Sequence, residues 1–424
     1  MVCIKFLRWR FKMRKVWNKD LVLLLLGQSI SRLGDNAHQI ALMWFILEKT
    51  GSSAIMGTLS ALAYIPSVLL GPFAGVIVDK YSRKKIILLS DLIRGLIVAL
   101  LALFYFTKGL SISEIFILTV LLGISSAFFN PCIPSSIPEM VDPEDLPRAN
   151  SLFSIAGRVT EIIGPSAGGI LYKFVGAGLL FSFNAVSFFI ASIFTIFTRI
   201  PQRYKEGKMN FIGDIGEVLK RLKEDKTLMT LGITAAVLNF FYVPFFILLP
   251  VYIRNYLHLD ASMYGFVLGA GGIGSLVGLL ITSAISPSGD KKYRMFKFSL
   301  MGQGVAIGLL ALPLNRIQLV ILFFVIQLLN IFVNIYINVT LQLMVPSEER
   351  GRFFGLLGLF VGGLQPISMS LSGIIAEYVK IPIIFTVCTV VILSMSWRII
   401  TLKELKNLFN IEKRKEEEVL VSHP

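Results

Sequence analysis

Long apolar segments recur along the whole chain and constrain its fold more than any other feature. Each is about 20 residues or longer, the length that a helix needs to cross a bilayer core of about 30 Å. The runs are continuous rather than alternating, which favours helices over barrel strands. Hydrophobic residues make up 55% of the 424 residues and charged residues only 16%, which indicates a polytopic membrane protein. The twelve predicted spans are 20–48, 52–78, 86–107, 113–137, 149–173, 177–198, 227–256, 261–285, 294–313, 316–344, 352–376 and 380–401.

Basic residues are distributed unevenly between the two sides that these spans define. If the N-terminus is cytoplasmic, 32 of the 41 Lys and Arg residues lie in or beside the cytoplasmic loops and tails, 6 lie on the other side, and 3 lie within spans. This is the positive-inside pattern, with both termini in the cytoplasm. The net charge of +15 is therefore interpreted as a topology signal, and nucleic acid is not expected as a partner. No small-residue cleavage site follows the basic N-terminal region, so we expect the first span to stay in the mature protein.

The two halves of the chain resemble each other. Three features recur at nearly one offset: Gly71 and Gly75 as Gly274 and Gly278, Arg148 as Arg352, and Pro165 and Gly169 as Pro366 and Gly373. Duplicated halves of this kind place a binding site at their interface and give alternating access by rocking. The predicted parts are a six-helix bundle at 1–198, a cytoplasmic linker with an amphipathic helix at 199–226, a second six-helix bundle at 227–401, and a cytoplasmic tail at 402–424.

Two short motifs and one longer pattern resemble a known family. "GVIVDKYSRKK", residues 75–85, is similar to the loop signature that follows the second span in the major facilitator superfamily, although Ser82 replaces a glycine. "GPSAGG", residues 164–169, matches the core of the fifth-span motif of its drug:proton antiporters. The stretch 48–95 is similar to the macrolide-efflux branch of that superfamily. The resemblance implies an all-α membrane fold, with twelve transmembrane helices in two pseudo-repeated six-helix bundles.

The resemblance also implies roles for motif residues. Asp79 and Arg83 would form an interdomain charge clasp that closes the cytoplasmic side. Ser82 occupies the position of a motif glycine. Glycine tolerates a positive φ, whereas serine does not. The gating residues expected are Gly75, Asp79, Lys80, Arg83, Lys84, Asp91 and Arg94. The antiporter motif comprises Gly164, Pro165, Gly168 and Gly169, which generic close helix packing would explain equally well.

Charges inside spans are costly and therefore indicate function by default. They form three acid–Arg sets, each three residues apart on one helix face: Arg32 and Asp35, Asp91 and Arg94, and Arg158 and Glu161. We expect the second set to be a neutralised structural pair. Asp35 is the first choice for a carboxylate that exchanges protons and Glu161 the second, because no acid lies well inside a span of the C-terminal half. His38 is either a proton relay or a packing residue.

Polar stripes follow two of the spans. Gln28, Arg32, Asp35 and Gln39 share one face of the first span, and Asn330, Asn334, Asn338 and Gln342 recur every four residues in the tenth. Such stripes serve as interhelical hydrogen-bond partners or face a hydrated cavity, and four in register favour the cavity. In the resembled fold the first, fourth, seventh and tenth spans line that cavity, which adds Asn130, Asn239 and Tyr242 as substrate contacts.

These features predict a secondary transporter rather than an enzyme. The three cysteines give no disulfide framework or metal-ligand spacing, and no phosphate-cradling loop or catalytic triad is present, so no metal or cofactor is expected. The predicted function is export of an amphipathic, macrolide-like compound by proton antiport, as a monomer in the bacterial inner membrane. The alternatives are a siderophore or lysophospholipid exporter, an uncoupled facilitator of the same fold, and a membrane scaffold or sensor that transports nothing.

Overall fold

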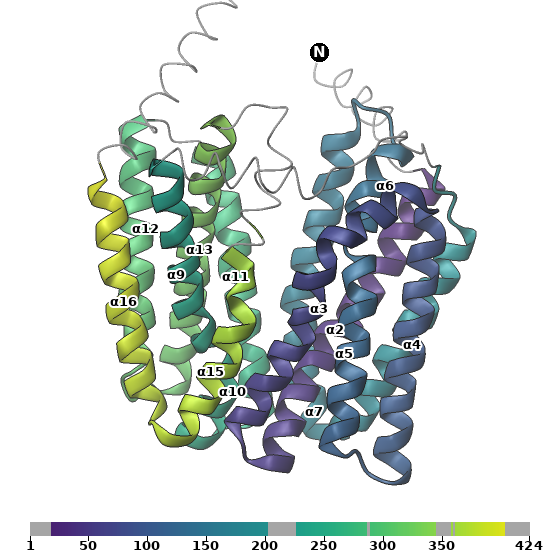
Figure 1. Ribbon diagram of the computed structural model, residues 1–424, viewed down its shortest axis with the longest axis horizontal. Coiled ribbons are helices and arrows are strands. Elements are labelled where there is room, and N and C mark those ends of the chain that lie inside the picture. Colours follow the sequence, from purple (N-terminus) through teal and green to yellow (C-terminus); the bar gives the residue numbers. More distant parts are fainter. Residues whose placement is uncertain (1–17, 202–225, 286–288, 345–357, 359–360, 403–424) are drawn as a thin grey trace, which may run out of the picture. The chain divides into compact units, whose positions relative to one another are not determined.

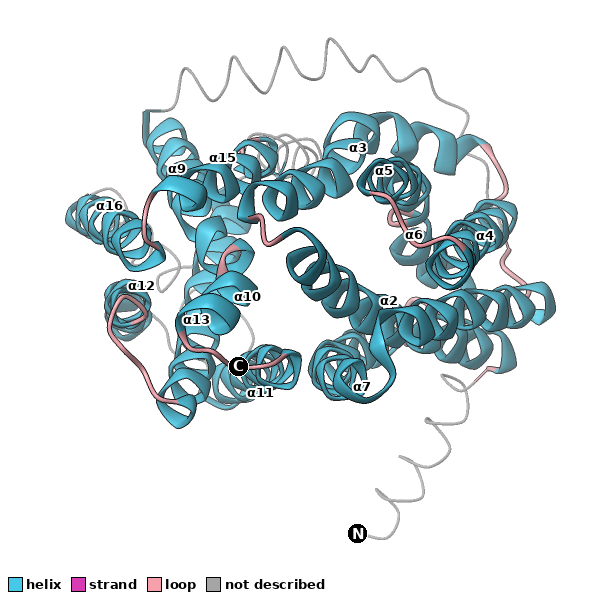
Figure 2. Cartoon of the chain, turned by 90° about the horizontal axis from the view of Figure 1, so that it is seen from below, coloured by secondary structure: helices cyan, strands magenta, loops and turns pink. Residues whose placement is uncertain are grey.

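The computed structural model describes residues 18–201, 226–285, 289–344, 358 and 361–402. Within these ranges every regular element is a helix (Figures 1 and 2). The amphipathic segment predicted inside 199–226 lies almost wholly outside the described residues, and so does Arg352.

The first half of the chain forms long helices joined by short turns. Its helices are α2 (Lys19–Thr50), α3 (Ser53–Lys80), α4 (Arg83–Thr107), α5 (Ile112–Phe129), α6 (Cys132–Met140) and α7 (Leu146–Phe197). Helix α5 begins with a capping box, in which the side chains of Ser111 and Glu114 each bond the other's backbone N–H. It ends before Pro131, which has no N–H to continue the helical ladder.

The second half repeats this plan. Its helices are α9 (Lys226–Ile247), α10 (Leu249–Val251), the π-helix η1 (Tyr252–Tyr256), α11 (Ala261–Ile285), α12 (Gly289–Leu309), α13 (Arg316–Met344), α15 (Gln365–Tyr378) and α16 (Ile381–Thr401). The α9 span bends near Pro244, whose missing N–H and ring interrupt the regular hydrogen-bond ladder.

Described helices overlap all twelve predicted spans, although residues 352–357, 359 and 360 of the span 352–376 lie outside the described residues. Eight of these helices are long and apolar enough to cross a membrane. One of the eight is α7, which covers two predicted spans. It is interrupted at Gly176, whose φ of 71° would be strained for a residue with a Cβ. Helices α2, α12 and α15 supply the other three; α2 and α12 carry several charged residues, and α15 has only 14 residues.

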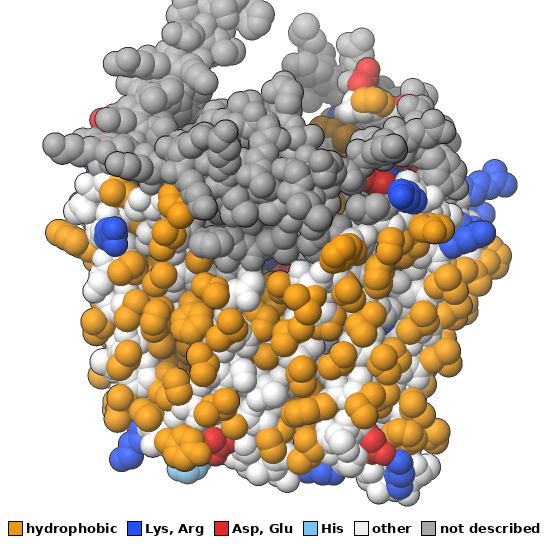
Figure 3. All heavy atoms as spheres, viewed as in Figure 1, with side chains coloured by type: hydrophobic (Ala, Val, Ile, Leu, Met, Phe, Trp, Pro, Cys, Tyr) orange, Lys and Arg blue, Asp and Glu red, His pale blue; other side chains and the backbone are white. Residues whose placement is uncertain are grey.

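The chain folds into two compact units, each with its own core. Unit 1 comprises Met1–Lys49, Leu62–Met209 and Asp260–Gly265, and unit 2 comprises Thr50–Ala61, Asn210–Leu259 and Phe266–Pro424. Unit 1 thus includes the first turn of α11, and the rest of that helix belongs to unit 2. Unit 2 includes the first turns of α3, and the rest of that helix belongs to unit 1. On the face seen in Figure 3, hydrophobic side chains cover the helices, and the charged side chains lie near helix ends. This pattern suits helices surrounded by lipid.

Glycines allow the first turns of α3 and of α11 to pack closely against a neighbouring helix of the same unit. In unit 2, a Cβ on Gly57 of α3 would lie 2.5 Å from the Met369 carbonyl oxygen of α15. The Glu377 carboxylate also accepts hydrogen bonds from Ser52 and from the Ala54 N–H at the start of α3. In unit 1, a Cβ on Gly169 of α7 would lie 2.4 Å from a backbone oxygen at the start of α11. Residues with side chains would push these helix pairs apart.

Candidate functional site

A buried guanidinium lies at the centre of unit 1. The Arg94 side chain, only 5% exposed, stacks between the rings of Phe129 and Phe188 at 3.8 and 4.5 Å from their centroids. Its Nη2 atom donates to Asp91 Oδ1 at 2.5 Å, across one turn of α4. Its Nη1 atom lies 3.8 Å from Asp35 Oδ2 of α2. The aromatic rings and two carboxylates together compensate a cation that is removed from water.

Asp35 therefore has its ion pair with a residue of another helix. The i, i+3 spacing predicted Arg32 as its partner, whereas the structure pairs Asp35 with Arg94 and adds a hydrogen bond of 3.3 Å from Asn184 Nδ2 of α7. The Arg32 guanidinium instead lies against α7, where a Cβ on Gly157 would be 2.8 Å from Nη1. Spacing along one helix detects neighbours on that helix only, so both Arg94 and Asn184 were missed as partners of Asp35.

Exposure distinguishes the two carboxylates that contact Arg94. The Asp91 side chain is fully buried, whereas that of Asp35 is 42% exposed. One guanidinium between two carboxylates leaves a net charge of −1 when both acids are ionised, and one added proton makes the cluster neutral. Asp35 is the more exposed of the two and has the longer contact to Arg94.

The other polar residues of the α2 stripe do not share one environment. Gln39 and Arg32 are exposed, whereas Gln28 is buried beside the Asp91 carboxylate. His38 is also buried, with its ring centroid 5.1 Å from that of Phe181. Neither ring nitrogen of His38 has a hydrogen-bond partner among the described residues, so this geometry favours packing over a proton relay.

Arg158 and Glu161 form an ion pair on the exposed face of α7. Their side-chain atoms lie 2.7 Å apart, as the spacing predicted. Both side chains are substantially exposed, so the pair lacks the buried partners that surround Arg94. An exposed pair of this kind contributes little to stability and opens readily.

The loop motif has a partner that the sequence did not indicate. Arg83 pairs with Glu139 of α6 at 2.6 Å and donates to the Ser135 carbonyl oxygen at 2.8 Å, while Asp79 lies farther away at 3.6 Å. Ser82 has a φ of −59° and caps α4, so this position does not need a glycine. Within unit 1, Arg83 therefore links α4 to α6, and its contact with Asp79 is longer than its contacts with α6.

The antiporter motif packs α7 tightly on α2. A Cβ on Gly164 would lie 2.5 Å from Asn36 Cβ, and one on Gly168 would lie 2.8 Å from Ala37 Cα. Asn36 also donates a hydrogen bond of 3.0 Å to the Thr160 carbonyl oxygen. These glycines thus set the distance between α7 and the helix that carries Asp35.

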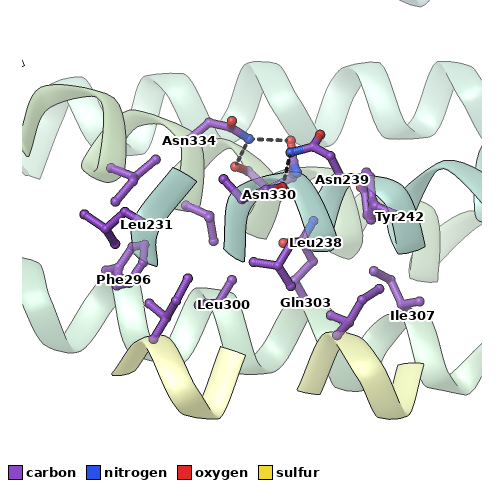
Figure 4. A pocket seen from close by; sticks show the side chains of 15 residues that line it. Leu231, Leu238, Asn239, Tyr242, Phe296, Leu300, Gln303, Ile307, Asn330 and Asn334 are labelled. Carbon is purple, nitrogen blue, oxygen red and sulfur yellow. Dashed lines mark hydrogen bonds between the residues drawn. The ribbon is translucent and has the colours of Figure 1, made fainter. Parts of the chain in front are cut away.

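Unit 2 contains a cavity of about 150 Å³ among α9, α12, α13 and α16 (Figure 4). It includes four of the predicted substrate contacts and adds Gln303. Its lining residues are Leu231, Ala235, Leu238, Asn239, Tyr242, Phe296, Leu300, Gln303, Ile307, Asn330, Val333, Asn334, Ile337, Ile392 and Ile399. Gln303 was missed because it lies in the ninth predicted span, whereas the resembled fold assigns the cavity to the first, fourth, seventh and tenth spans.

The remaining predicted contacts lie elsewhere. Asn338 is exposed on α13 and donates to the Asn334 carbonyl oxygen at 2.8 Å. Asn130 is exposed at the break between α5 and α6. The side chain of Gln342 lies outside the described residues.

No group of three or more His, Cys, Asp or Glu side chains suited to a metal ion occurs among the described residues. Cys132 and Cys388 are both buried and unpaired.

A helical membrane fold with a buried charge cluster in one unit and a polar-rimmed cavity in the other defines a membrane transporter. The Major Facilitator Superfamily model matches residues 24–364, and the chain belongs to this superfamily. It is a multi-pass membrane transporter, not an enzyme.

Similar proteins include exporters and other transporters. The chain is 24% identical over 388 residues to Macrolide efflux protein A of Streptococcus pyogenes, covering 89% of this chain and 92% of the relative. It is 26% identical over 361 residues to the Staphyloferrin A transporter of Staphylococcus aureus, covering 81% and 86%. Its fold matches a bacterial homologue of the iron transporter ferroportin with a TM-score of 0.71 and 16% identity, over 90% of this chain and 98% of that one.

Proposed function

We propose that this protein exports an amphipathic, drug-like compound in exchange for protons. It acts as a monomer in the bacterial inner membrane, with both termini in the cytoplasm, as the Lys and Arg asymmetry favours. The observation that carries the proposal is the position of Asp35, a half-exposed carboxylate that shares a buried guanidinium with a second carboxylate.

The charge balance around Arg94 explains why Asp35 suits coupling. When Asp35 is ionised it is held toward Arg94 and Asn184. Protonation neutralises Asp35 and weakens its contact to Arg94, which frees α2 to shift against α4. The charged groups that face Asp35 are Arg94 and Asp91 of α4 and Arg32 of its own helix. A proton gradient would thereby favour one arrangement of α2 over the other.

The relatives and the amide groups of unit 2 support an amphipathic substrate. The relative from Streptococcus pyogenes is a macrolide efflux protein. Apolar walls with a few polar groups give affinity through apolar area and orientation through hydrogen bonds. Macrolide-like compounds combine both kinds of surface.

The experiment that tests export uses a drug-sensitive bacterial host. Cells expressing the wild-type chain should accumulate less macrolide than cells with empty vector, and a protonophore should abolish the difference. Asp35→Asn should behave like empty vector, whereas Asp142→Asn, at an exposed loop position, should behave like wild type. Equal export by wild type and Asp35→Asn would remove the proposed role of Asp35.

Siderophore export is the second candidate, because a staphyloferrin A transporter is among the relatives. Siderophores of the carboxylate type are anionic, whereas no lining residue of the unit 2 cavity is Lys or Arg. The cavity therefore offers an anionic siderophore no counter-ion. Export of an iron-free siderophore by the same cells, with no effect on macrolide accumulation, would support this alternative instead.

A further inference from the structure

The cavity of unit 2 has a polar rim and a mostly apolar floor, which includes the buried amide of Gln303. In Figure 4, Asn239, Asn330 and Asn334 lie on one side of it, and Phe296, Leu300 and Ile307 lie on the other. The three asparagines are exposed or half-buried, whereas the three apolar side chains are fully buried. A group that enters past the rim is thus transferred from a polar surface to an apolar interior.

The rim presents hydrogen-bond acceptors. The Nδ2 atoms of Asn239 and Asn334 donate to backbone oxygens of Ala235 and Asn330, both at 2.9 Å. Only the nitrogen of an amide donates to a carbonyl, so these bonds fix which side-chain atom faces away. No described hydrogen bond uses the Oδ1 atom of either asparagine. Asn334 Nδ2 also donates to Asn330 Oδ1 at 2.9 Å, which leaves the amide nitrogen of Asn330 as a donor. The matching group on a ligand is therefore one that both donates and accepts, such as a hydroxyl.

The charge and the volume of the cavity further restrict which ligands it can bind. The lining residues include no Asp, Glu, Lys, Arg or His, so an ion would lose its water without gaining a counter-ion. A cavity of about 150 Å³ accommodates a group about the size of benzene, whereas whole drug-sized ligands need about 300–1,000 Å³. The cavity therefore takes one part of a larger molecule.

We infer that this cavity is a subsite for a neutral, hydroxyl-bearing ring of the exported compound. The inference rests on the proposed export function, because export defines the larger compound to which the ring belongs. The ring packs against the apolar side chains of the floor, and its hydroxyl donates a hydrogen bond to an asparagine oxygen at the rim. Unit 2 thereby selects for uncharged ring substituents, while the charge cluster of unit 1 stays free for protons.

The test measures binding without transport. The midpoint of thermal unfolding of the purified protein in detergent is followed against the concentration of cyclohexanol, with cyclohexylammonium as a charged ring of similar size. Ala235→Leu and Val333→Phe fill the cavity from two different helices. Ala284→Leu makes the same change as the first at an exposed position of α11.

Cyclohexanol should raise the midpoint of the wild type and of Ala284→Leu. In both filled variants the half-saturating concentration should rise at least about tenfold, and cyclohexylammonium should give no comparable rise in any of them. Equal responses of all four proteins to cyclohexanol, or equal stabilisation by the ammonium, would overturn the subsite. Asp35→Asn should keep cyclohexanol binding, so loss of export in that variant tests the proposed function separately.

Discussion

Arg94 determines the charge balance of unit 1. It is a buried cation that Asp35 and Asp91 share, and two aromatic rings cover its faces. The pairs Asp91–Arg94 and Arg158–Glu161 could be predicted, because partners on one helix follow from spacing. The contact of Asp35 with Arg94 could not, since it depends on how α2 packs on α4.

Removing the cation should destabilise unit 1. In Arg94→Gln, the fully buried Asp91 loses its counter-charge, which should lower the free energy of unfolding by about 3–5 kcal/mol. The double variant Asp91→Asn/Arg94→Gln should recover part of this loss, because it leaves no uncompensated charge. Denaturant unfolding in detergent measures both. A single variant at least as stable as the double one would show that Asp91 does not depend on Arg94.

At the scale of elements, glycines set the distance between α7 and α2. The motif and many of the helix boundaries were predictable from the sequence, since apolar runs and turn residues mark them, but the break between α5 and α6 inside the predicted span 113–137 was not. The neighbours of each glycine were not, because a small-residue pattern indicates close packing without identifying the partner helix. The structure supplies Asn36 and Ala37 as these neighbours.

Adding one methyl group to this contact should be costly. In Gly168→Ala the new Cβ would lie 2.8 Å from Ala37 Cα, so a backbone must shift. Overpacking of this kind costs about 1–3 kcal/mol, and the variant should unfold at a lower temperature. Gly71→Ala is the control, because a Cβ there meets no described atom within 4 Å. The prediction fails if both variants lose the same amount of stability.

The start of α11 should respond to acid. The Lys173 ammonium, which donates a hydrogen bond of 2.8 Å to Asp260, lowers the pKa of that carboxyl below its usual value. The contact therefore stabilises unit 1 above about pH 4 and is lost as pH falls through the lowered pKa. The effect is small because both side chains are about half exposed. Amide hydrogen exchange in α11 should accelerate as pH falls through the lowered pKa of Asp260, beyond the intrinsic effect of pH, in wild type but not in Asp260→Asn.

At the scale of the whole molecule, the two units use equivalent helices for different chemistry. Unit 1 holds its acids and Arg94 among α2, α4 and α7, and unit 2 has an uncharged cavity among α9, α12, α13 and α16. The sequence predicted this division in part, since the second half has no acid well inside a span. Where the cavity lies was not predictable, because its volume depends on side chains from four helices.

The central claim is that protonation of Asp35 couples the gradient to export. In proteoliposomes with an imposed pH gradient, the wild type should move a macrolide uphill. Asp35→Asn should lose uphill transport and keep exchange of labelled for unlabelled substrate, because a permanently neutral residue cannot carry a proton but leaves the fold intact. Full gradient-driven transport by Asp35→Asn would contradict the account.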